Sequence, residues 1–432
     1  MPTVTASADG AARLLPVQFT AAADAGRVMT PAGYEIDADT ARRFELATPA
    51  NTRRGRESRT GLFLEWCGER GRVPADPGTV PDYCAHLARL RHPAATIAAY
   101  ASTLANLLAV NGRPLNDQDR YLIQGVLDSR AVEEATDPDD PGDALQSTEC
   151  TRENLRAMVA TLDRSTDRGR RDAFALLLDW YMAGRSCEPG ALGVLDVRED
   201  TARVPDPTGG PAVELAALEI VVRRSKTNVH GRRRDIVRLV EQSAADADLC
   251  PVRAWREWMA VLDGHGLAHT GPLLRRIDRW GRLGGTGKCA GRQPDDKRQA
   301  AGIGARTIRN LIATCARAAD LVRELTTSEK ELLSTAAERA ELAAAENDAQ
   351  REEIRVSRRV RRRALRRRLP RYTGHSMRRG LVRHLERIGM PRHVIERAAR
   401  FVPGSKALAR YGLDLLPWAD NPTVHMRASL RE

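Results

Sequence analysis

A histidine and an arginine three residues apart, His375 and Arg378, lie at the beginning of a predicted helix. Ser376 is suited to be its N-cap, and Gly389 marks its end. The apolar residues of its buried face follow the helical period: Leu381, Leu385 and Ile388. With His375 just outside the helix and Arg378 in its first turn, both side chains can face one anion, which the helix dipole also attracts. A histidine and an arginine at this spacing, with no other motif, are more often a structural cap and a solvated arginine. The predicted anion site therefore needs support from other residues.

Motifs for other kinds of catalysis are missing from the sequence. No GxGxxG follows a predicted strand, and no GxSxG, HExxH or DFG-like set occurs. The stretch Gly281–Lys288 imitates a P-loop, but Arg282 stands where the first glycine belongs, and Cys289 replaces the Ser or Thr after the lysine. We therefore expect neither hydrolysis of nucleoside triphosphates nor metal-dependent hydrolysis.

The chain of 432 residues carries a net charge of +12. Such a surplus attracts polyanions, although it can also serve solubility alone. Because no apolar run of membrane-spanning length and no signal-like segment occurs, nucleic acid is favoured over a membrane surface as the partner. The seven cysteines are widely spaced and include no CxxC, which indicates no disulfide framework and no zinc site and fits a reducing cytoplasm.

The first part of the chain is predicted to be helical after a flexible arm. Residues 1–34 are rich in Ala, Thr and Gly without periodicity. The unit at 35–132 shows four helical patterns: 60–69, 79–90, 96–110 and 115–127. Four arginines precede the first of these helices, where they either grip phosphates or form a solvated face: Arg53, Arg54, Arg56 and Arg59. The acidic segment at 133–146, rich in Pro and Gly, is predicted to be a linker.

The second domain, residues 147–432, is predicted to be mostly helical with a small β-sheet, an α+β fold. An apolar helix at 172–183 is ended by Gly184. Two strands, 217–223 and 235–240, flank a basic turn at 224–231, and helices follow at 251–262 and 305–319.

A helical insertion near 320–368 interrupts this domain. The segment is almost free of Gly and Pro, which predicts one or two long helices. Its first half is mixed to acidic, and its second half, with Arg358 and Arg362, is densely basic. The basic half either contacts DNA or pairs with the acidic half.

Four motifs in order along the chain resemble those of the tyrosine recombinase (phage integrase) family, in particular site-specific integrases of actinobacterial type. Gly184–Glu188 resembles the first box, where an arginine is followed three residues later by an acidic residue. Arg223–Thr227 resembles the β-hairpin that carries a lysine, and His375 to Arg378 resembles the HxxR box. Tyr411 falls at the position of the nucleophile. The unit at 35–132 resembles the core-binding domain of this family, and 147–432 its catalytic domain.

The resemblance implies that Tyr411 attacks a DNA phosphate and forms a 3′-phosphotyrosyl ester, which stores the bond energy without a nucleotide. Arg185 and Arg378 would clamp the nonbridging oxygens, because guanidiniums bind them bidentately and stay charged. Lys226 would protonate the leaving 5′ oxygen as general acid. His375 would act as a base or phosphate ligand.

Further residues take supporting roles by the same resemblance. Glu188 would orient its neighbours, while Arg224 and Arg379 would contact DNA. The family usually places His or Trp nine residues before the tyrosine, where this chain has Val402, with Phe401 one residue earlier. Phe401 can supply the packing of a tryptophan but no hydrogen bond.

The implied partner is double-stranded DNA, bound by a homo-tetramer on paired sites, with a monomer or dimer in the absence of DNA. The implied location is the bacterial cytoplasm, associated with the nucleoid, and no cofactor, metal ion or membrane is expected. Other functions stay open: a weakly active or inactive DNA-binding protein of the same fold, or a telomere resolvase or transposase with the same chemistry.

Overall fold

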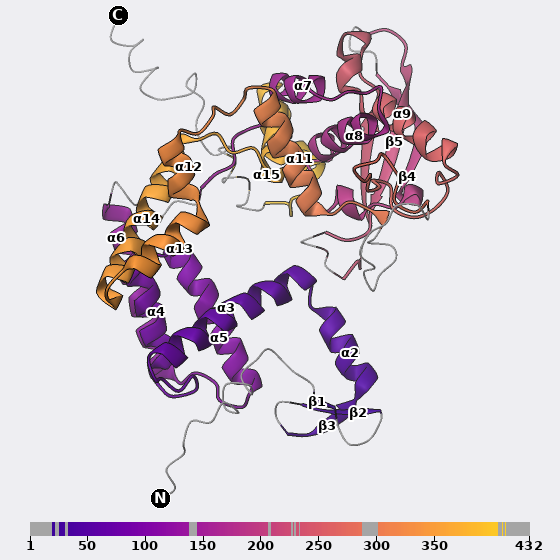
Figure 1. The fold of residues 1–432 in the computed structure, drawn as a ribbon. Helices are drawn as coiled ribbons and strands as arrows, with labels where there is room; N and C mark the ends of the chain where they lie inside the picture. The colour runs from indigo at the N-terminus through magenta and orange to yellow at the C-terminus, as the bar shows by residue number, and fades with distance from the viewer. Residues whose placement is uncertain are drawn as a thin grey trace, which may run out of the picture. The chain divides into compact units, whose positions relative to one another are not determined.

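The chain folds into helices and two small antiparallel sheets, as the computed structural model in Figure 1 shows. The structure describes residues 20–21, 26–30, 33–137, 145–205, 209–225, 228, 230–232, 234–286, 301–404, 408 and 411. Contacts divide the chain into two units. Unit 1 comprises residues 1–145 and 325–368, and unit 2 comprises residues 146–324 and 369–432.

Unit 1 begins with a small sheet where the sequence predicts a flexible arm. Strands β1 (Thr20–Ala21), β2 (Arg27–Met29) and β3 (Glu35–Asp37) pair in that order, with Val28 opposite Ile36. The prediction of a flexible arm at 1–34 is therefore wrong for β1 and β2. Such short strands pair their backbone N–H and C=O groups without the long alternation of apolar and polar residues by which a strand is predicted from sequence. Residues 1–19 lie outside the described part.

The four helices predicted in unit 1 are confirmed, with bounds that differ: two begin earlier than predicted, one ends a residue earlier, and the last begins two residues later but ends nine residues later. After α2 (Ala38–Ala47) they are α3 (Ala50–Glu69), α4 (Thr79–Arg89), α5 (Ala94–Val110) and α6 (Asp117–Thr136). The linker predicted from residue 133 begins later, because α6 continues through its acidic start. Glu134 accepts a hydrogen bond of 2.9 Å from the backbone N–H of Ala94, and Glu133 accepts one of 2.8 Å from Arg130. Most of the predicted linker, residues 138–144, lies outside the described part.

The core of unit 1 is built around an aromatic group on α3 and α4. Phe63 and Trp66 each lie within about 5 Å of Tyr83, with ring centroids 5.2 and 5.1 Å away. Burial raises the pKa of the Cys67 and Cys84 thiols to about 12. These cysteines are therefore packing residues rather than reactive thiols.

The insertion forms two short helices and one long helix of 21 residues, so the prediction of one or two long helices is confirmed for its second half only. They are α12 (Thr327–Leu333), α13 (Thr335–Ala344) and α14 (Asp348–Arg368). Ser334 divides the first two, because it is extended and its hydroxyl caps α13 by accepting from Ala337 N–H at 3.2 Å. The sequence places this segment within the second domain, whereas its contacts group it with unit 1. Arg359 on α14 donates to the carbonyl of Leu90 at the end of α4.

Unit 2 holds the second sheet and its helices. The sheet has β5 (Val213–Val222) between β4 (Val197–Val204) and β6 (Asp235–Val240), all antiparallel. The helices are α7 (Arg152–Ala160), α8 (Asp167–Tyr181), α9 (Pro251–Gly264), α11 (Ala305–Ala318), α15 (Gly374–Arg387) and α16 (Arg392–Ala398). The two predicted strands are confirmed as β5 and β6. Strand β4 was missed because its middle is polar and exposed, as suits an edge strand.

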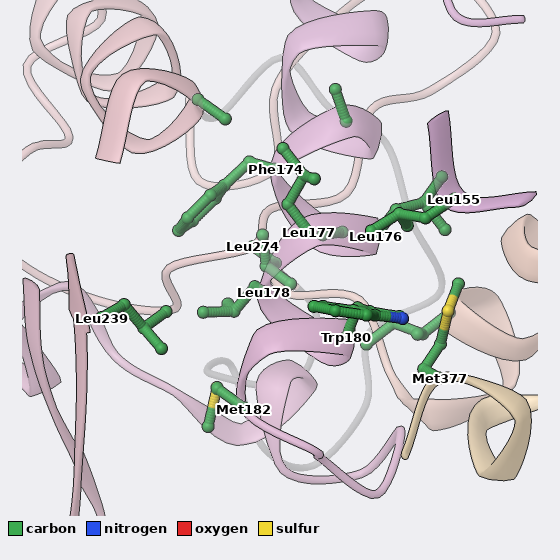
Figure 2. Packing of buried hydrophobic residues seen from close by; sticks show 14 of the residues in the cluster. Leu155, Phe174, Leu176, Leu177, Leu178, Trp180, Met182, Leu239, Leu274 and Met377 are labelled. Carbon is green, nitrogen blue, oxygen red and sulfur yellow. The ribbon is translucent and has the colours of Figure 1, made fainter. Parts of the chain in front are cut away.

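Helix α8 is the centre of unit 2, and most of its length is buried. Figure 2 shows its apolar side chains between Leu239 of β6, Leu274 and Met377 of α15. Trp180 on α8 donates from its indole N–H to the Cys150 carbonyl at 2.9 Å. A helix held on so many sides is a rigid support for the residues that follow it. Within the described part of the chain, none of the helices has both the length and the apolar character that crossing a bilayer requires.

Candidate functional site

The segment after α8 positions Arg185 through an unusual turn. The sequence predicts that Gly184 ends this helix, but Met182 is the C-cap and Ala183 is the residue in the left-handed region, with φ of 43°. Gly184 is needed for space, because a Cβ there would lie 2.8 Å from a carboxyl oxygen of Asp179. The chain therefore passes close to the end of α8 just before Arg185.

Arg185 and Arg400 share one buried carboxylate, Glu188. The Nη1 of Arg185 lies 3.1 Å from Oε1 of Glu188, and Nη2 of Arg400 donates to Oε2. The side chain of Glu188 is 1% exposed, that of Arg400 10% and that of Arg185 21%. Glu188 thus touches Arg185, as its predicted orienting role requires. Arg400 was missed, because nothing in sequence separates it from many other arginines.

Helix α15 carries the HxxR motif, and its first turn differs from the prediction. Thr373 is the N-cap rather than Ser376, and its hydroxyl accepts from the backbone N–H of His375 at 3.2 Å. Ser376 instead accepts from the Thr373 N–H at 2.8 Å. His375 is therefore inside the first turn, with an exposed side chain. A Cβ on Gly374 would lie 1.8 Å from Oγ of Ser186, so this turn packs directly on the segment of Arg185.

The later part of α15 also departs from the predicted buried face. Leu381 is buried, but Ile388 is 53% exposed because it is already the C-cap residue. Gly389 follows with φ of 77° and ends the helix as predicted.

Arg378 is one of the most buried cations of the chain, at 1% exposure. Its two terminal nitrogens donate to the carbonyls of Ala183, at 2.8 Å, and Ala399. Its guanidinium carbon lies 4.3 Å from the centroid of the Phe401 ring. Burial lowers the pKa of Arg378 to about 10, partly offset by the attraction of Tyr411. The side chain therefore stays charged at neutral pH.

Tyr411 also contacts the Phe401 ring. The two ring centroids are 5.5 Å apart at 69°, an edge-to-face pair. Tyr411 is half-buried. Phe401 thus supplies the packing that the sequence assigns to it, between Arg378 and Tyr411.

The other tyrosine near the HxxR motif, Tyr372, belongs to the core instead. It is 8% exposed, and its hydroxyl accepts from the amide of Asn154 at 2.9 Å. Burial raises its pKa. Tyr372 is therefore a structural residue.

Asp179, in the last turn of α8, is an unexpected member of this cluster. It is fully buried, and neither carboxyl oxygen has a hydrogen-bond partner among the described residues; nor does the buried Nη1 of Arg400. Burial, and next the nearby Glu188, raise the pKa of Asp179 from 3.8 to about 8. The carboxyl is therefore mostly protonated at neutral pH. Arg185, Arg378 and Arg400 then face a single carboxylate, so the cluster has an excess of positive charge.

Lys226, the predicted general acid, lies outside the described residues. Its setting is the connection between β5 and β6. Arg223 donates to the carboxylate of Asp196 at 2.5 Å, and Ser225 forms an isolated bridge with Asn228. Arg224, a predicted DNA contact, is exposed in this connection.

The arginines predicted to contact DNA from α3 differ in exposure. Arg54 and Arg56 are exposed, and Arg53 is half-buried. Arg59 packs 5.9 Å from the centroid of Tyr100 and donates to Thr103 at 3.1 Å, which ties α3 to α5. These arginines lie within α3 rather than ahead of it.

Arg358 and Arg362 are corrected from predicted DNA contacts to internal clamps. Arg358 is 4% exposed and donates to Glu341 and to the Glu331 carbonyl at 2.8 Å. Arg362 donates to Glu338 and to the Leu332 carbonyl, both at 2.6 Å. These two arginines of the basic half thus pair with the acidic half, because unpaired carbonyls at the end of α12 attract guanidiniums.

Arg379 is half-buried and donates to the side-chain oxygen of Gln146. Among the residues that the structure describes, no group of three His, Cys, Asp or Glu side chains could hold a metal ion. Comparison of the chain with known protein families and with curated proteins finds no match.

Proposed function

We propose that this protein cleaves and rejoins double-stranded DNA through a covalent bond to Tyr411, as a site-specific tyrosine recombinase that integrates or excises a mobile element. The observation that carries the proposal is the set of contacts from Arg378 to Tyr411. Phe401 contacts both the guanidinium of Arg378 and the ring of Tyr411, and Arg185 lies within electrostatic reach of Arg378. Three distant parts of the chain therefore contribute to one basic cluster beside a tyrosine.

The charge of this cluster fits a phosphodiester. Negative charge grows on the nonbridging oxygens during in-line displacement, and fixed guanidiniums stabilise it. Arg378 uses one hydrogen on each terminal nitrogen for a carbonyl, and each of these nitrogens carries a second hydrogen. Arg185, the most exposed of the three arginines, would reach the phosphate first.

The reaction itself is a transesterification. The phenol oxygen of Tyr411 bonds to phosphorus as the bond to the 5′ oxygen breaks, which leaves a 3′-phosphotyrosyl ester. The phenol proton passes to a base, for which His375 is the candidate, and the 5′ oxygen takes a proton from Lys226. Attack by a 5′ hydroxyl of another strand reverses the step and joins the strands. The enzyme would act as a homo-tetramer on two sites.

The test is trapping of the covalent intermediate. The full-length protein is mixed with nicked duplexes made from the DNA that flanks its own coding region, and denaturant-resistant adducts are digested and identified by mass spectrometry. We expect a nucleotide on Tyr411. Tyr411→Phe should form no adduct, whereas Tyr372→Phe, the matched control, should form it. An adduct in Tyr411→Phe would contradict the assignment of the nucleophile.

A second candidate function is DNA binding without cleavage. Two observations favour it: Arg378 is 1% exposed, and the position nine residues before Tyr411 is Val402, which has no hydrogen-bond donor. This candidate predicts salt-sensitive binding of the same duplexes and no adduct with the wild-type protein.

A further inference from the structure

Residues 146–150, the first segment of unit 2, lie along the residues that lead into α15. Thr148 and Arg371 exchange two hydrogen bonds. The backbone N–H of Thr148 donates to the Arg371 carbonyl at 2.9 Å, and the Thr148 hydroxyl accepts from the backbone N–H of Arg371 at 2.8 Å. Both bonds use backbone groups of Arg371, so the segment 146–150 fixes the path of the chain just before the HxxR motif.

The segment 146–150 also holds the first turn of α15. The hydroxyls of Ser147 and Thr373 are 2.7 Å apart and share a hydrogen bond. The Thr373 hydroxyl in turn accepts from the backbone N–H of His375 at 3.2 Å. The backbone N–H of Cys150 donates to the Ser376 carbonyl at 3.1 Å. His375 therefore lies in a turn that this segment holds both at its N-cap and at a carbonyl.

The same segment contacts α8, the helix that precedes Arg185. The Cys150 carbonyl accepts from the Trp180 indole N–H at 2.9 Å. A Cβ on Gly380 would lie 1.9 Å from this carbonyl oxygen and 2.7 Å from the indole nitrogen, so α15 packs directly on the bond. The segment 146–150 thus joins the two helices on which the halves of the candidate site depend: α8, which leads to Arg185, and α15, which carries Arg378.

The place of this segment in the chain adds a reason for its contacts. The chain passes from unit 1 into unit 2 at residue 146 and returns to unit 2 at residue 369, two residues before Arg371. The bonds between Thr148 and Arg371 therefore join two of the three places where the chain passes between the units. Because closely packed segments transmit strain, a displacement of either connection would reach the turn of His375.

We propose that Ser147 and Thr148 are positioning residues of the candidate catalytic site, which fix the beginning of α15 against the end of α8 so that His375 and Arg378 keep the geometry that the reaction requires. The inference rests on the proposed cleavage of DNA. Both hydroxyls are bonded to groups of the protein, so they act on the chemical step rather than on the affinity for DNA.

The test compares the rate of adduct formation with the affinity for DNA. Thr148→Val removes the hydroxyl that accepts from Arg371, and Ser147→Ala removes the partner of Thr373. The full-length protein is mixed with saturating nicked duplex, and the single-turnover rate of the adduct on Tyr411 is measured. We expect each variant to be slower by about 10-fold or more, because a misplacement of ~1 Å can cost about 100-fold. The dissociation constant of the duplex should stay near the wild-type value, and Thr148→Ser should restore the rate.

Thr286→Val is the matched control. Thr286 is half-buried like Thr148, and its hydroxyl donates to the Leu283 carbonyl within its own turn at 2.8 Å. Both valine variants lose one hydrogen bond of unit 2, so the midpoint of urea unfolding should fall by a similar amount in each. Only Thr148→Val should slow adduct formation, since a small loss of stability leaves the protein folded.

A wild-type rate in Thr148→Val or in Ser147→Ala would overturn the positioning role of that residue and leave the proposed function standing. Equal slowing of Thr148→Val and Thr286→Val would overturn the role of Thr148 as well, because the rate would then follow stability alone. If the wild type forms no adduct, the proposed cleavage fails and the positioning role fails with it.

Discussion

The buried carboxyl of Asp179 should make unit 2 less stable as pH rises. Its pKa is raised from 3.8 to about 8 in the folded protein, so between these values the folded state keeps a proton that the unfolded state has lost. The stability that this proton provides is therefore full at low pH and is lost as pH rises toward 8. Within this window each pH unit lowers the free energy of unfolding by roughly 1 kcal/mol.

Asp179→Asn removes the ionisable group and leaves the volume nearly unchanged. Its buried amide carries a constant cost, so the slope with pH, rather than the stability at one pH, is the diagnostic quantity. Between pH 5 and 8 the wild type should lose up to roughly 4 kcal/mol relative to the variant. This is an upper figure, because a shift of Arg400 toward the carboxylate would relieve part of the cost.

The measurement is urea unfolding at several pH values, followed by the fluorescence of the buried tryptophans of unit 2. Asp263→Asn, an exposed residue on α9, is the matched control and should run parallel to the wild type. If Asp179→Asn also runs parallel to the wild type, Asp179 is ionised in the folded protein and the excess positive charge argued for the cluster is wrong.

Two further substitutions test packing inside each unit, one in unit 2 and one in unit 1. Gly380→Ala should destabilise unit 2 by more than about 2 kcal/mol, measured by urea unfolding, because its Cβ would lie 1.9 Å from the Cys150 carbonyl oxygen; Gly264→Ala, which meets nothing within 4 Å, should be near neutral. Arg358→Met should destabilise unit 1 by about 2–4 kcal/mol and increase hydrogen exchange in the insertion, because carbonyls at the end of α12 lose their donors, whereas Arg361→Met, an exposed position, should do neither. If Gly380→Ala were as stable as Gly264→Ala, or Arg358→Met as stable as Arg361→Met, the packing described for that unit would be contradicted.

Local patterns predict several helices of this chain closely, although α2, α7 and α16 were not predicted. The period of buried residues on α4, α5 and α9 is a property of nearby residues, and all three helices lie within a few residues of their predicted bounds. The edge strand β4 was not predicted, because its middle is polar and an edge strand needs little apolar surface. The N-cap of α15 was also predicted wrongly, since Thr373 and Ser376 are both residues that commonly cap a helix and the sequence alone does not separate them.

The candidate site was predicted only in part, for a related reason. Arg185, Glu188 and Arg378 form recognisable motifs, and their contacts join the end of α8 to α15. Arg400 and Asp179 carry no motif, because their importance arises from burial beside residues distant in sequence. A pKa near 8 for Asp179 depends on removal of water, which no local pattern encodes.

Because the chain is rich in arginine, its composition alone does not show which arginines contact DNA. A guanidinium binds carboxylates, backbone carbonyls and phosphates with the same donors. In the insertion, Arg358 and Arg362 satisfy internal acceptors, so its basic half has less free charge than the sequence implies. Near residue 280, Asp278 accepts from the backbone of its own turn, and the guanidinium carbon of Arg279 lies 4.0 Å from the Trp280 ring centroid. The number of arginines in a segment is therefore a poor guide to DNA contacts, because internal carbonyls and carboxylates already bind the guanidiniums of Arg358 and Arg362.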